Sequence, residues 1–160
     1  MSKSFQLLAA RGVQKLKSYL PGKPVEELER ELGISNSIKL ASNENPLGPS
    51  PKAVEAIRAH CGAVNFYPDG GGFKLGSKIA EKFNVDFNCV TLGNGSNDIL
   101  ELVARAFLTS ETSAVFSEYS FAVYPIVVQT VSAAANVAKA FPLDHATMPL
   151  GHNPETLLAS

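Results

Sequence analysis

Apolar residues recur every three or four positions in several segments, and turn-forming residues separate these segments. The clearest case is the stretch 96–107, whose predicted helical face holds Ile99, Leu102, Val103, Ala106 and Phe107. Similar spacing, with proline near the start or glycine after the end, predicts further helices over 24–32, 51–60, 73–83, 121–131 and from Pro154 onward. In the helix 51–60 we expect Val54 and Ile57 to face inward.

Short apolar runs between these helices predict β-strands at 38–40, 90–92, 114–116 and 136–141. From residue 90 onward the order is strand, helix, strand, helix, strand. Because such βαβαβ connections are right-handed and need helical crossovers, this order predicts a parallel sheet covered by helices. The fold class is therefore α/β. Three strands are few for a sheet buried on both faces, so we expect the sheet to be incomplete.

Composition and charge narrow the class of protein. The chain has 160 residues, 45% of them hydrophobic, with 14 Lys and Arg against 15 Asp and Glu. This balance predicts a globular protein with no electrostatic attraction to nucleic acid or to an anionic membrane. No apolar run approaches the roughly 18 residues that span a bilayer. Two distant cysteines argue against a disulfide scaffold. The N-terminal stretch is basic and free of acidic residues, as in a mitochondrial presequence, but acidic residues follow it at once, so a cytoplasmic location is favoured.

A glycine-rich loop, Gly93-Asn94-Gly95-Ser96-Asn97, lies between a predicted strand and a predicted helix. Glycines allow close approach of the backbone to a ligand, and free N–H groups at a helix start attract an anion. In α/β folds this position is the carboxyl end of a strand, where ligands bind. The loop matches neither a Walker motif nor a dinucleotide fingerprint, so it favours a single phosphate. An ordinary βα turn with Ser96 as helix cap is an equally good interpretation of this motif alone.

Aromatic residues follow the second predicted strand of this unit. Phe116 lies inside the strand and is expected in the core. Phe121 and Tyr124 come after it and suit either helix packing or stacking on a flat ring. Tyr67 stands in the turn 67–70, where a plain exposed turn residue is favoured over a phosphate donor. The three histidines, at 60, 145 and 152, have no ligand-spaced partners, so no metal site is expected.

Five segments, in order and in register, resemble the amino-terminal part of histidinol-phosphate aminotransferases: 21–28, 39–51, 67–70, 92–98 and 116–124. The resemblance extends from about Gly12 to the end of the chain. It implies a fold-type-I, pyridoxal 5′-phosphate-dependent aminotransferase that works as a homodimer. Members of this family transfer an amino group between histidinol phosphate and the 2-oxoglutarate/glutamate pair in histidine biosynthesis.

The resemblance also implies roles for individual residues. Gly95, Ser96 and Asn97 would bind the cofactor phosphate, Phe121 would stack on its pyridine ring, and Tyr67 would reach the phosphate bound by the neighbouring subunit.

For the substrate, the resemblance implies contacts from Asn43 and Asn45, in the loop that lines the entrance, and from Tyr124. Residues 1–60 would form the N-terminal arm and a segment of the small domain. Residues 61–160 would form the first βαβαβ part of an incomplete large, cofactor-binding domain.

Members of this family continue well beyond this length, with an aspartate at the pyridine nitrogen, a Schiff-base lysine and an arginine for the substrate carboxylate. None has a counterpart here, so we expect no catalytic residue in this chain and no activity from it alone. Two alternatives remain: a shortened, non-catalytic paralogue that binds a full-length partner or a phosphorylated ligand, and an aminotransferase of another amino-acid specificity.

Overall fold

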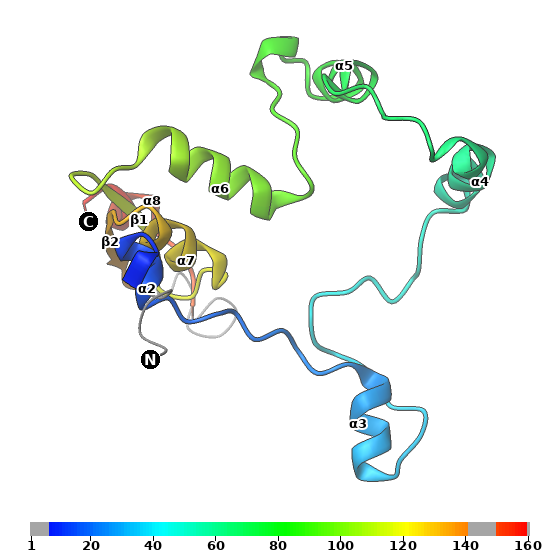
Figure 1. Ribbon diagram of the computed structural model, residues 1–160, viewed down its shortest axis with the longest axis horizontal. Coiled ribbons are helices and arrows are strands. Elements are labelled where there is room, and N and C mark those ends of the chain that lie inside the picture. The colour runs from blue at the N-terminus through cyan, green and yellow to red at the C-terminus, as the bar shows by residue number, and fades with distance from the viewer. Residues whose placement is uncertain (1–6, 141–149, 160) are drawn as a thin grey trace. The chain divides into compact units, whose positions relative to one another are not determined.

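The computed structural model describes residues 7–140 and 150–159 (Figure 1). The chain divides into two compact units. The sheet unit comprises residues 1–19 and 88–160, and the helical unit comprises residues 20–87. These units follow from contacts inside this chain, so the predicted domain boundary after residue 60 stays a prediction.

The sheet unit is built on one parallel βαβ element. Strand β1 (Ser113–Ser117) pairs with β2 (Ala134–Ala138), and helix α7 (Val123–Thr130) connects them. The register runs from Ser113 opposite Ala134 to Ser117 opposite Ala138. The parallel pairing and the helical crossover agree with the predicted α/β class.

The core of the sheet unit forms where β1 and α7 meet helix α6 (Ser96–Phe107). Its buried members are Ala104, Phe116, Val123, Val127 and Val128. Phe116 is 8% exposed, as its position inside a strand predicts. These side chains come from three consecutive elements, and the core forms only where these elements pack against one another.

The predicted apolar face of α6 is wrong in detail. Leu102, Val103 and Phe107 are exposed, whereas Ala104 is buried and Leu100 packs against the core. Apolar residues surround much of this helix, and three of them spaced by four, Leu100, Ala104 and the C-cap residue Leu108, belong to the core or pack against it. The neighbouring elements therefore select a different stripe from the one that periodicity favours.

Two short helices complete the sheet unit. Helix α8 (Pro154–Leu158) begins at the predicted proline and contacts β1, and the Asn153 side chain accepts a hydrogen bond from the Glu155 backbone N–H at 2.8 Å. Helix α2 (Arg11–Gln14), which the sequence pattern did not predict, lies beside α7 (Figure 1).

The helical unit contains α3 (Val25–Leu32), α4 (Pro51–His60), the 3₁₀ turn η1 (Cys61–Ala63) and α5 (Phe73–Phe83). A second 3₁₀ turn, η2 (Phe87–Cys89), follows α5 in the chain. All three helices match the predicted ranges within one residue. Gly33 ends α3 in the left-handed conformation, with φ 65°. Only Gly76 and Ala80 are buried in this unit, and Ile57 is exposed, so the inward orientation predicted for it is wrong.

Two predicted strands are not formed. Residues 38–40 and 90–92 carry no strand pairing, so β1 and β2 form a two-stranded sheet within the part of the chain that the structure describes. A strand requires a hydrogen-bonded neighbour, and no described segment pairs with either run. The last predicted strand, 136–141, ends at Ala138 in the structure, and its predicted end at Phe141 lies outside the described residues.

Candidate functional site

The glycine-rich loop leads directly into the first turn of α6. Gly95 precedes the helix with φ 86° and ψ 178°, a conformation that is almost restricted to glycine. A Cβ atom at Gly93 would lie 2.9 Å from the Cβ of Asp98, too close for a normal contact. The structure therefore requires glycine at both positions: at Gly95 because of the dihedral angles, and at Gly93 because there is no space for a side chain.

The Asp98 carboxylate holds this loop against the helix. It accepts hydrogen bonds from the Asn94 backbone N–H at 2.9 Å and from the Asn94 side-chain amide at 3.1 Å. Gly95, at the N-cap, offers no side chain to the first turn of α6. The N–H groups of a helix's first turn have no intrahelical acceptor and form its positive end, so this turn is suited to bind an anion.

A cavity of about 440 Å³ begins at this helix start. Its walls are Ser96, Ile99, Leu100, Phe121 and Tyr124. The structure thus brings Ser96 of the predicted phosphate loop to the same cavity as Phe121 and Tyr124. Gly95 and Asn97, the other predicted phosphate ligands, flank Ser96 in the chain but do not line this cavity.

Phe121 stands in the turn between β1 and α7, at the carboxyl end of a parallel strand. The Phe121 carbonyl accepts a hydrogen bond from the Tyr124 backbone N–H at 3.0 Å. The Tyr19 ring meets the Phe121 ring edge-on, with centroids 5.6 Å apart and planes at 65°. Tyr19 was missed by the sequence reasoning, because no local signal relates it to a residue a hundred positions away.

An ion pair supports the turn before Phe121. Lys139 Nζ donates to Glu118 Oε1 at 2.8 Å, and the Ala140 backbone N–H donates to Glu118 Oε2 at 3.2 Å. The Lys139 hydrogen bond lowers the pKa of Glu118, and the same bond raises the pKa of Lys139. Glu118 directly follows β1 and Lys139 directly follows β2, and the ends of a parallel pair lie side by side. The sequence pattern did not predict this pair, because it placed Lys139 inside the strand 136–141.

The predicted substrate residues Asn43 and Asn45 belong to the helical unit. They line a second cavity there, of about 350 Å³, formed by residues 38–41 and 43–46. The Asn45 side chain accepts a hydrogen bond from the Leu47 backbone N–H at 3.0 Å. Lys39 and Glu44 form an ion pair at 2.7 Å beside them. This cavity joins a cation, an anion and two amides in one short segment.

Tyr67 also belongs to the helical unit and is fully exposed. The neighbouring Asp69 carboxylate accepts hydrogen bonds from the Gly71 N–H at 3.0 Å and the Phe73 N–H at 2.8 Å. Both bonds lower the pKa of Asp69, and the bond from Phe73 has the larger effect. They hold the turn that follows Tyr67 against the start of α5. Tyr67 is therefore an exposed side chain next to an ordered turn.

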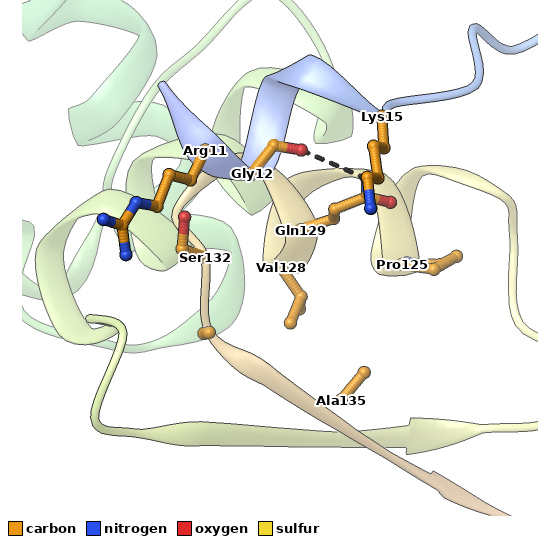
Figure 2. A pocket seen from close by; sticks show the side chains of 9 residues that line it. Arg11, Gly12, Lys15, Pro125, Val128, Gln129, Ser132 and Ala135 are labelled. Atoms are coloured by element: carbon orange, nitrogen blue, oxygen red, sulfur yellow. Dashed lines mark hydrogen bonds between the residues drawn. The ribbon is translucent and has the colours of Figure 1, made fainter. Parts of the chain in front are cut away.

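A further cavity, of about 380 Å³, lies between α2 and α7 (Figure 2).

His152, from the segment before α8, forms a hydrogen bond through Nδ1 with Ser117 Oγ, while His145 lies outside the described residues. Across residues 7–140 and 150–159, no group of three His, Cys, Asp or Glu side chains is arranged to hold a metal ion. No helix in those residues has the length and hydropathy to cross a membrane.

Comparison with known proteins identifies relatives over nearly the whole chain, although no protein-family model matches it. Histidinol-phosphate aminotransferase 2 of Pseudomonas aeruginosa is 57% identical over 158 residues, which are 98% of this chain and 41% of that protein. Histidinol-phosphate aminotransferase 2 of Methylococcus capsulatus is 53% identical over 156 residues, which are 97% of this chain and 42% of that protein. The chain therefore spans about two fifths of the length of these curated relatives.

A solved structure shows the fold. The crystal structure of histidinol-phosphate aminotransferase from Sinorhizobium meliloti, in complex with pyridoxal-5′-phosphate, matches with a TM-score of 0.76 at 21% sequence identity. The match covers 93% of this chain and 38% of that one. The chain thus has the α/β fold of part of that enzyme, as the sequence predicted.

Proposed function

We propose, from the membership of this chain in the histidinol-phosphate aminotransferase family, that it supplies the phosphate-binding and ring-binding part of an aminotransferase site. The cofactor is pyridoxal 5′-phosphate. The observation that carries the proposal is the cavity that joins Ser96, at the start of α6, to Phe121 and Tyr124.

The residues of this cavity fit a phosphate ester on a flat ring. Such a molecule needs hydrogen-bond donors at one end and an apolar or aromatic wall at the other. Ser96 and the first turn of α6 supply the donors, whereas Ile99, Leu100 and the Phe121 ring supply the wall. None of the described residues that line this cavity is acidic, which leaves the site open to an anion.

Each residue has a distinct part in binding. Ser96 and Asn97 would hold the phosphate by hydrogen bonds at the positive end of α6, and Gly95 would leave room for its close approach. Phe121 would stack on the ring and exclude water from that side. When bound, the cofactor supplies an electron-accepting pyridine ring that stabilises negative charge on a substrate carbon.

The substrates we propose are histidinol phosphate and the 2-oxoglutarate/glutamate pair, in histidine biosynthesis in the cytoplasm. The names of the relatives support the first of these. Asn43, Asn45 and Tyr124 contact the substrate. Tyr67 binds the cofactor phosphate of a second subunit in a homodimer, and its full exposure leaves it accessible to a second copy.

The 160-residue chain has no aminotransferase activity by itself in this proposal. A lysine that carries the proton in this reaction is implied by the family resemblance and has no counterpart among these residues. A positioned proton carrier contributes about 10²–10⁴-fold to a rate, so its lack leaves binding without turnover.

The test is a titration of the ¹⁵N-labelled 160-residue chain with pyridoxal 5′-phosphate, followed by two-dimensional NMR. Pyridoxal without the phosphate serves as the matched ligand. We expect weak binding of the phosphorylated compound, with shifts of the Ser96, Asn97 and Phe121 amides. Ser96→Ala reduces these shifts, whereas Ser50→Ala, which changes a serine before α4 in the other unit, leaves them unchanged.

Equal shifts with pyridoxal, or shifts that avoid the start of α6, contradict the proposed phosphate site. Turnover of histidinol phosphate by the chain alone contradicts the proposed lack of activity. Co-purification with a full-length aminotransferase, without any response to pyridoxal 5′-phosphate, indicates instead the non-catalytic, partner-binding role.

A further inference from the structure

Helix α2 approaches the end of α7 more closely than any side chain would allow. A Cβ atom built on Gly12 would lie 1.9 Å from the backbone oxygen of Gln129 and 2.9 Å from Ser132 Oγ. At such a distance the backbone would have to move. Glycine at position 12 is therefore what permits the two backbones to meet (Figure 2).

A side-chain hydrogen bond joins the same two elements. Gln129 Nε2 donates to the Gly12 carbonyl oxygen at 3.1 Å, in a half-buried position, and Figure 2 shows this side chain directed at α2. Helix α2 has four residues, too few to be stable in water without tertiary contacts. Its docking on α7 through Gly12 and Gln129 is therefore the interaction that orders this part of the chain.

Seven residues after Gly12, the same segment reaches the other end of α7. Tyr19 packs edge-on against Phe121, two residues before α7 begins at Val123, whereas Gln129 lies in its last turn. Eight helical residues extend about 12 Å at 1.5 Å per residue. Residues 12–19 are long enough to cover that distance, so the segment contacts α7 at its C-terminal end and Phe121 just before its N-terminal end.

We propose that Gly12 and Gln129 form a latch that sets the position of residues 11–19 along α7, and that this latch places the Tyr19 ring against Phe121. Gly12 and Gln129 are thus positioning residues for the cavity of Ser96, Phe121 and Tyr124. Phe121 lines that cavity and is in contact with solvent, so an edge contact from Tyr19 restricts the orientations of its ring. Only the identity of the ligand in that cavity rests on the proposed function.

The latch is tested by ¹⁹F NMR on the full 160-residue chain labelled with 3-fluorotyrosine. The chain has four tyrosines, and Tyr19→Phe assigns the resonance of interest. In Gly12→Ala we expect the Tyr19 resonance to move to its unfolded position while the Tyr124 resonance keeps its own. Gly62→Ala is the matched control, because a Cβ atom there meets nothing within 4 Å; it leaves Tyr19 unchanged.

Gln129→Met provides a second, milder variant, since it keeps the length of the side chain and removes the donor. A hydrogen bond of ordinary strength corresponds to a change of about fivefold in the equilibrium constant for docking, which shifts the Tyr19 resonance part of the way. If Gly12→Ala unfolds the sheet unit, Gln129→Met still tests whether the latch positions Tyr19. A Tyr19 resonance that stays in place in both variants, or in Gln129→Met alone when Gly12→Ala unfolds, overturns the latch.

Addition of pyridoxal 5′-phosphate to the labelled wild-type chain separates this proposal from the proposed function. If Gly12→Ala shifts the Tyr19 resonance but pyridoxal 5′-phosphate shifts neither the Tyr19 nor the Tyr124 resonance, the latch is supported and the proposed ligand is wrong. If pyridoxal 5′-phosphate shifts the Tyr124 resonance and neither latch variant shifts the Tyr19 resonance, the ligand assignment is supported and the latch is wrong.

Discussion

The two units of the chain contain similar amphipathic helices but bury very different sets of side chains. In the sheet unit, α6 and α7 pack against β1 around Phe116 and Val128. In the helical unit, α3 and α4 bury no residue at all, and α5 buries Gly76 and Ala80. The comparison shows that helix signals suffice to place helices along a chain, whereas a core requires a sheet or a second helix to pack against.

This difference has a consequence for the exposed apolar residues. Leu40, Leu47 and Tyr67 of the helical unit are almost fully exposed. Many other apolar side chains of this unit are exposed as well, and exposed apolar surface of this extent indicates contact with another protein surface. The proposed homodimer supplies one such surface, and it would convert the helical unit from a set of separate helices into a packed layer.

The largest expected effect comes from the core. Phe116→Ala removes a buried ring from the sheet unit, so we expect the free energy of unfolding to fall by about 3 kcal/mol, enough to abolish the transition in a marginal chain. Phe66→Ala, an exposed ring in the helical unit, changes it by less than about 0.5 kcal/mol. Urea denaturation followed by circular dichroism measures both. Equal losses would show that the helical unit is packed as well.

Hydrogen exchange gives the second prediction. We expect amides of β1, β2 and α7 to exchange about a hundredfold more slowly than those of α3 and α4, because opening the sheet unit exposes a core whereas opening those helices exposes none. Exchange followed by mass spectrometry measures the ratio. Similar rates in the two units would contradict the comparison, and slowing of α3 and α4 at high protein concentration would support their burial in a dimer.

Backbone strain gives a third, smaller difference. Gly95→Ala forces alanine into a region that is almost restricted to glycine, so we expect a loss of about 2 kcal/mol in the sheet unit. Gly33→Ala forces the milder left-handed conformation at the end of α3, at a cost of about 1 kcal/mol. The first loss is visible in global urea unfolding. The second is confined to local helix content, measured by circular dichroism or hydrogen exchange.

The smallest effect is the pH dependence of the ion pair between Glu118 and Lys139. The folded pKa of Glu118 lies below its ordinary value of 4.5, so its stabilisation is complete above that pH and is lost as the pH falls through the folded pKa. The folded pKa of Lys139 lies above its ordinary value of 10.5, so its contribution is present below that pH and is lost above the folded pKa.

Unfolding curves of the wild type and Glu118→Gln at several pH values measure this dependence. We expect the two stabilities to differ most between about pH 5 and 10 and to converge in acid. In the helical unit, Asp69→Asn is the comparison, because the lowered pKa of Asp69 likewise means that its contribution disappears in acid. A difference between wild type and Glu118→Gln that persists in acid would show that Glu118 acts by packing and not by charge.

The sequence by itself determined the local elements. Pro51, Gly33 and Pro154 placed helix ends correctly, because caps and breakers act on the residues next to them. The sequence also identified Ser96 at the start of α6 and Phe121 after β1, which line one cavity in the structure, whereas their binding of a ligand stays a prediction.

Only the tertiary structure decided which faces and partners these elements use. It selected Leu100 and Ala104 of α6 for the core, left residues 90–92 without a strand partner, and set Tyr19 against Phe121. Each of these depends on contacts between residues far apart along the chain. Periodicity and local propensity carry no information about such contacts, because they report which residues lie near one another within a single element.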